Sequence, residues 1–108
     1  MRKKYLGKII FAEFGTYKDY PFLIGLQLGF RMDGSCVFDG GKYTINHNKK
    51  CKWEEDERNK AFVAMVENVV DILKKAKVNY VSQLIGKPVM VTIENNTFKD
   101  FRILAEVL

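Results

Sequence analysis

One histidine and two cysteines are the side chains of this sequence best suited to metal binding or nucleophilic chemistry. They are Cys36, His47 and Cys51. A closed structural zinc site uses four protein ligands, and neither a fourth candidate nor a C-x-x-C pair stands near these three. A Cys–His nucleophile pair is conceivable from composition alone. Cys36 follows a strand-like pattern beside Val37, however, where cysteine commonly packs as a small hydrophobe. The sequence therefore predicts neither a metal site nor a catalytic cysteine.

Carboxylates of the first half offer only a weak alternative. Glu13 and Asp19 flank a loop and could orient a bound hydroxyl or ribose, although loop acids are usually solvated. The motifs G-x-x-x-x-G-K-[ST] and G-x-G-x-x-G are both missing from the sequence, so the common phosphate-binding loops are not expected. Gly40-Gly41-Lys42 combines exposed amides with a cation, which is a weak anion-binding signal. We expect a protein that is not an enzyme and uses no cofactor.

Aromatic and basic side chains are interleaved in the first half of the chain. The aromatic residues are Tyr17, Tyr20, Phe38, Tyr43 and Trp53, and the cations between them are Lys18, Arg31, Lys42, Lys49, Lys50 and Lys52. Rings stack on bases while cations meet phosphates, as in nucleotide and single-strand binders. Residues 1–53 hold ten Lys/Arg against four Asp/Glu (+6), and residues 54–108 hold eight against nine (−1). This balance favours anionic partners, with a basic domain lacking such a partner as the alternative.

The segment Phe22 to Met32 reads as a strand with two different faces. Its even-numbered residues are apolar, whereas the other face carries Leu23, Gly25, Gln27, Gly29 and Arg31. Glycine within a strand often marks the close approach of a ligand or of another backbone. We therefore expect this second face to be either an anion-binding floor or a contact with a second protomer.

The remaining elements follow from hydrophobic periodicity and turn signals. Strands are predicted at Lys4–Phe14, Phe22–Met32, Ser35–Asp39, Val89–Glu94 and Thr97–Val107, with Lys42–Ile45 as a further short extended piece. Asp33-Gly34 and Asn95-Asn96 are hairpin-turn signals. A helix is predicted over Glu54–Lys77 from the stripe Phe62, Val66, Val69, Leu73 and Ala76. A short extra turn is expected at Asn79–Ile85, with Asn79 as its cap and Gly86 as its stop.

This order predicts a single α+β domain spanning residues 1–108. We expect an antiparallel sheet of four to five strands, in the order β-β-β-α-β-β, with one long helix packed on one face. The basic start of the chain is followed by alternating sequence, unlike a signal peptide. No apolar run approaches membrane-spanning length, and two cysteines do not make a disulfide framework. The sequence therefore favours a cytoplasmic protein with free thiols.

Several segments resemble a known family. They are Ala76 to Val89, Thr92 to Lys99, Arg102 to Leu104, the helix entry at Trp53 with Arg58, and the loop Gly15-x-Tyr17-Lys18-Asp19 leading to Gly25-Leu26. Over most of its length the chain is similar to a family of small uncharacterised proteins of tailed bacteriophages and prophages. It departs by lacking a Thr cap between Trp53 and Glu54 and by carrying Met90 where an acidic residue is expected. The resemblance brings no activity with it, but phage origin implies a small binding protein, by association only.

Together these expectations lead to a functional hypothesis. The chain is expected to be a phage-encoded, non-enzymatic counter-defence protein of the bacterial host cytoplasm that sequesters a small anionic nucleotide signal. Its ligand-binding residues would be Tyr17, Lys18, Asp19 and Tyr20 as a lid, Gln27 on the floor, Arg31 and Lys42 for phosphate, and Tyr43. The alternative is an inhibitor or accessory protein that binds single-stranded nucleic acid or a host defence protein, as anti-CRISPR proteins do. We also expect a homo-oligomer and no membrane association.

Overall fold

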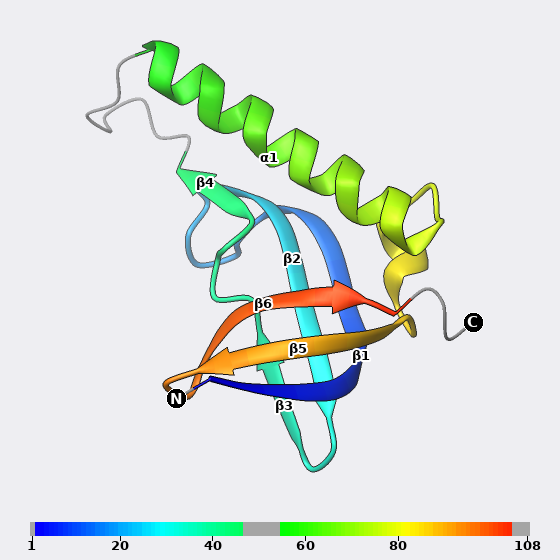
Figure 1. The fold of residues 1–108 in the computed structure, drawn as a ribbon. Helices are drawn as coiled ribbons and strands as arrows, with labels where there is room; N and C mark the ends of the chain where they lie inside the picture. Colours follow the sequence, from blue (N-terminus) through cyan, green and yellow to red (C-terminus); the bar gives the residue numbers. More distant parts are fainter. Residues whose placement is uncertain (1, 47–54, 105–108) are drawn as a thin grey trace.

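The computed structural model describes residues 2–46 and 55–104, which form one curled antiparallel sheet and one long helix (Figure 1). The strands are β1 (Arg2–Thr16), β2 (Leu23–Met32), β3 (Ser35–Phe38), β4 (Thr44–Asn46), β5 (Pro88–Glu94) and β6 (Thr97–Ile103). The helix α1 spans Glu55–Ala76, and a short 3₁₀ helix, η1, spans Val81–Leu84. The predicted α+β class and element order are confirmed. Over the described residues the sheet has six strands instead of four to five, because Thr44–Asn46 pairs with β2 as a strand of its own.

The first strand connects the two halves of the sheet. The strands are ordered β3-β2-β1-β5-β6, with β4 also paired to β2. The first half of β1 pairs with β5 and the second half with β2. Between Ile9 and Phe11 the register with β2 shifts by an extra residue. Such a bulge bends a strand and increases its twist, and the sheet curls accordingly (Figure 1).

The concave side of the sheet holds the apolar core. Phe30 on β2 is fully buried, as predicted for the even-numbered face of this strand. Its ring stacks on Phe98 with the centroids 5.2 Å apart, and the centroid of Phe101 lies 5.0 Å away. Tyr43, from the loop after β3, meets the same two β6 rings edge-on. These aromatic contacts bring β6 against the β3–β4 loop and close the curl around Phe30.

The helix α1 packs on this core mainly through its C-terminal half. Ile72 and Ala76 belong to the buried cluster, and Val69 and Leu73 pack against it. The predicted stripe is therefore confirmed towards the C-terminus, whereas Val66 is 52% exposed and the adjacent Met65, only 6% exposed, takes the buried position at this turn. Within the described ranges, no helix combines the length and apolarity that crossing a membrane requires.

The helix ends in a Schellman arrangement around Lys77. The N–H of Val78 donates to the carbonyl of Leu73 and the N–H of Lys77 to that of Lys74, each at 3.1 Å. Lys77 takes a φ of 58°, the left-handed conformation that glycine usually supplies at this position. The last carbonyls of the helix thus find partners at the cost of a strained lysine.

The turn signals are largely confirmed. Asn95 and Asn96 have φ of 53° and 63°, as the predicted two-residue turn requires. The prediction of Asn79 as the cap of the following short helix is wrong, because Tyr80 occupies the N-cap position of η1. The Oε1 of Gln83 reaches back instead and accepts the N–H groups of both residues, at 3.0 and 2.9 Å.

Candidate functional site

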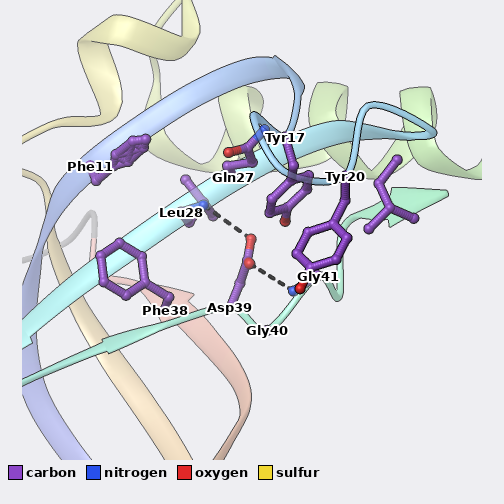
Figure 2. A pocket seen from close by; sticks show the side chains of 10 residues that line it. Phe11, Tyr17, Tyr20, Gln27, Leu28, Phe38, Asp39, Gly40 and Gly41 are labelled. Carbon is purple, nitrogen blue, oxygen red and sulfur yellow. Dashed lines mark hydrogen bonds between the residues drawn. The ribbon is translucent and has the colours of Figure 1, made fainter. Parts of the chain in front are cut away.

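A cavity of about 610 Å³ opens on the convex side of β2 (Figure 2). Its lining is dominated by four aromatic residues, Phe11, Tyr17, Tyr20 and Phe38, together with Leu23, Gln27, Leu28, Asp39, Gly40 and Gly41. The tyrosines come from the loop between β1 and β2, and Phe38 ends β3. Tyr20 and Phe38 are 55% and 61% exposed, so they form a rim open to solvent. We call this cavity the aromatic pocket.

The glycine floor predicted along β2 is not open, because the chain itself covers it. A Cβ on Gly29 would lie 2.8 Å from the Phe38 ring and 3.1 Å from the Cβ of Phe11. The rings of Phe11 and Phe38 meet edge-to-face above this position, with centroids 6.1 Å apart. At Gly25 a Cβ would lie only 2.3 Å from the carbonyl oxygen of Tyr43. Because these glycines have no side chain, the protein's own rings and backbone can lie directly against them. The rings of Phe11 and Phe38 form one wall of the aromatic pocket.

A buried carboxylate forms the edge of the pocket. Asp39 is 5% exposed, and its Oδ2 accepts the N–H of Leu28 while its Oδ1 accepts the N–H of Gly41, both at 3.0 Å (Figure 2). The backbone of Asp39 also donates to the Leu28 carbonyl at 3.1 Å. These bonds lie where the chain leaves the edge of β2 between β3 and β4. The carboxylate therefore accepts the Leu28 N–H in place of a carbonyl from a neighbouring strand.

Burial shifts the titration of two groups at this site. It raises the pKa of the Asp39 carboxyl, and the hydrogen bonds from Gly41 and Leu28 offset part of that effect. Burial also raises the pKa of the Tyr17 phenol, with a smaller contribution from the negative charge of Asp39 and an opposing one from a hydrogen bond with Thr44. Because the ordinary pKa of a tyrosine phenol is already 10.0, Tyr17 stays neutral at pH 7 and keeps its hydroxyl proton.

Three of the predicted site residues lie together at the pocket. Tyr17, Tyr20 and Gln27 all line it, and the Nε2 of Gln27 donates to the Gly15 carbonyl at 3.3 Å. Lys18 and Asp19 belong to the same loop and are exposed, but neither is among the lining residues.

The other predicted residues lie elsewhere. Lys42 and Tyr43 line a separate cavity of about 250 Å³ between α1 and β6. The Nζ of Lys42 donates to the carbonyl of Lys99 and lies 5.8 Å from the centroid of the Phe98 ring. Arg31 is exposed in a third groove, with Lys8. The predicted pairing of Arg31 with Lys42 around one phosphate is therefore not found, since the two cations line different cavities.

Phe11 and Asp39 are pocket residues that the sequence reasoning missed. Strand parity places Phe11 on the core side with Ile9, and the bulge between them moves it to the convex face. Asp39 precedes two glycines, a pattern that indicates a turn without revealing which N–H groups the carboxylate accepts. Cys36 is exposed instead of packed as a small hydrophobe.

Some candidates fall outside the described residues. These are His47, Cys51, Trp53, Lys49, Lys50 and Lys52. Among the residues that are described, no three His, Cys, Asp or Glu side chains are grouped so that they could hold a metal ion.

The pocket combines aromatic surface with few polar groups, and so it is suited to holding a flat ring. Its polar side chains are the Gln27 amide, the Asp39 carboxylate and the two tyrosine hydroxyls. The described residues that line it include no cation. Comparisons of the chain with protein-family models, with curated proteins and with solved structures found no match.

Proposed function

We propose that this chain is a non-enzymatic binding protein whose aromatic pocket holds the base of a nucleotide. The observation that carries the proposal is the grouping of four aromatic side chains around a cavity of about 610 Å³. Stacking of a base on aromatic side chains is worth about 1–3 kcal/mol per base. Tyr20 and Phe38 are the accessible rings of the rim, and they supply the stacking surface.

Polar groups at the pocket edge supply selectivity for the ring. An ionised carboxylate has about four acceptor positions, and Asp39 uses two of them for backbone N–H groups. Because Asp39 is only 5% exposed, its carboxylate mainly serves these backbone groups and meets a ligand only at its accessible edge. The neutral Tyr17 hydroxyl and the Gln27 amide can both donate and accept. This set recognises a ring without requiring any bond of the ligand to break.

Phosphate groups would lie outside the pocket, since none of the described residues that line it is a cation. The loop that carries the two pocket tyrosines also carries the exposed Lys18, and the first 53 residues have an excess of six positive charges. Both features favour an anionic ligand at the rim. In the phage setting that the sequence resemblance implies, retention of a nucleotide signal would counter host defence, which is the biological role we propose.

A titration with nucleosides tests this function. The ¹⁵N-labelled protein is titrated with the four ribonucleosides and their 5′-monophosphates, and amide shifts are followed by NMR. We expect saturable shifts at Gln27, Phe38 and Gly41. Tyr20→Ala should weaken binding about 5- to 150-fold, the equivalent of one lost stacking contact. Tyr80→Ala is the matched control, because Tyr80 is 69% exposed and lies outside the pocket.

Two results would contradict the proposal. One is that no nucleoside shifts the pocket amides at millimolar concentration. The other is that Tyr20→Ala and Tyr80→Ala bind with the affinity of the wild type. Recovery of a chemically altered ligand would instead show that the protein is an enzyme.

A further inference from the structure

Two cations face each other on the convex side of the sheet, beyond the aromatic pocket. Lys8 on β1 and Arg31 on β2 are direct partners across the antiparallel ladder, and both are exposed. Like charges placed directly opposite each other destabilise a sheet. The pairing therefore reduces stability unless an anion lies between the two side chains.

Within residues 2–46 and 55–104, no carboxylate forms an ion pair with either cation. In the described part of the chain, the ion pairs use Glu94 and Asp71 and involve neither Lys8 nor Arg31. Asp33 lines the same groove without coming within ion-pair distance of either cation. The two positive charges are thus available to an external anion.

A groove of about 600 Å³ surrounds the cations. Its lining residues are Leu6, Gly7, Lys8, Ile10, Arg31, Met32, Asp33 and Gly34. Leu6 is 66% exposed and Ile10 36%, so the charged groups lie beside accessible apolar surface. A ligand that carries both phosphates and flat apolar rings matches this combination.

The groove continues the face on which the aromatic pocket lies. Gln27 in the pocket and Arg31 in the groove point to the same side of β2, four residues apart, which is a separation of about 13 Å along the strand. On the neighbouring strand β1, Lys8 lies opposite Arg31 and Phe11 lies opposite Gly29. One ligand lying along these two strands would reach both sites.

The geometry points to a single-stranded oligonucleotide as the ligand of this face, with one base in the aromatic pocket and backbone phosphate on Lys8 and Arg31. This inference rests on the proposed base binding and extends it from a nucleotide to a polynucleotide strand. The strand must be single, because a base can enter the pocket only when it is unpaired and unstacked. Phosphate contacts add affinity without sequence preference.

Salt dependence measures the phosphate contacts directly. Fluorescence anisotropy with labelled eight-residue DNA and RNA strands of one mixed sequence gives the affinity over a series of salt concentrations. Each phosphate contact on a single strand contributes about −0.7 to the slope of log K against log salt. Arg31→Gln and Lys8→Gln should each make the slope shallower by about that amount, and the double variant by about twice as much. Lys60→Gln, on the exposed surface of α1, is the matched control.

Nucleoside binding distinguishes a failure of the phosphate site from a failure of the proposed base binding. All variants should bind the preferred nucleoside as the wild type does, since neither cation lines the aromatic pocket. If wild-type protein binds no nucleoside, the proposed function fails. The phosphate site is refuted if nucleosides bind but the groove variants keep the wild-type slope. It is also refuted if Lys60→Gln makes the slope shallower by the same amount as the groove variants do. A urea titration confirms that each variant is folded. Comparing the affinities for the DNA and the RNA strand shows which sugar is accepted.

Discussion

Replacing Asp39 with alanine tests whether one carboxylate holds the wall of the aromatic pocket in place. The substitution leaves two N–H groups without their acceptor, those of Leu28 and Gly41. The first of these bonds is buried, whereas the second is partly accessible to water. We expect Asp39→Ala to lower the free energy of unfolding and to loosen the loop on which Gly40 and Gly41 lie.

The magnitude follows from the two hydrogen bonds. A buried donor left without a partner costs about 1–3 kcal/mol, which applies in full to the Leu28 N–H. Water can replace the acceptor of Gly41, so that bond adds about 0.5–1 kcal/mol, the net worth of an ordinary hydrogen bond. The sum is about 1.5–4 kcal/mol. Asp39→Asn keeps one acceptor oxygen, which can serve Leu28, and we expect it to cost about 1 kcal/mol.

Urea denaturation followed by circular dichroism measures these differences. With a slope of about 1–3 kcal/mol per molar urea, a loss of about 1.5–4 kcal/mol should lower the midpoint of Asp39→Ala by about 0.5–4 M. Asp71→Ala is the control, because its exposed pair with Lys75 is worth about 0.3–0.5 kcal/mol. Equal midpoints for the two alanine variants would refute the assignment of Asp39 as the residue that fixes the loop.

The same residue gives a pH dependence whose sign is determined by burial. Folding raises the pKa of the Asp39 carboxyl. At a pH between the pKa of the unfolded state and that of the folded state, the folded chain therefore binds more protons than the unfolded chain. The stability from this group is therefore complete below the ordinary aspartate pKa and is lost as pH rises through the raised value. The stability of the wild type relative to Asp39→Asn should fall as pH rises across this window. A constant difference would contradict the role of burial.

Two further predictions concern backbone positions. Gly25→Ala should destabilise the fold by about 1–3 kcal/mol through overpacking, since the new Cβ meets the Tyr43 carbonyl, whereas Gly29→Ala should mainly displace the exposed Phe38 ring and weaken nucleoside binding. Equal urea midpoints for the two variants would contradict this distinction. Lys77→Gly should raise the free energy of unfolding by about 0.5–1 kcal/mol, because glycine tolerates the left-handed conformation that lysine holds under strain. A lower melting temperature would contradict that expectation.

Local signals in the sequence predicted most of the fold. The alternation in β2 and the asparagine turn depend on neighbouring residues, and so they could be read without tertiary information. The position of Phe11 could not, because one extra residue in a bulge reverses the side to which every later side chain points. The partner of Lys42 likewise depends on β6, more than fifty residues away in the sequence. The sequence thus predicted three residues of the site, Tyr17, Tyr20 and Gln27, and missed those whose positions depend on tertiary contacts.

The double pairing of β1 has a consequence for how this chain folds. Its second half pairs with β2 across a short loop, whereas its first half pairs with β5, where Arg2 lies opposite Glu94. Pairings between distant segments form slowly, because a long loop must close before any contact offsets its entropy. During synthesis the segment Arg2–Lys8 therefore has an unpaired edge until the last hairpin emerges. The three cations Arg2, Lys3 and Lys4 within it would discourage that edge from pairing with another nascent chain.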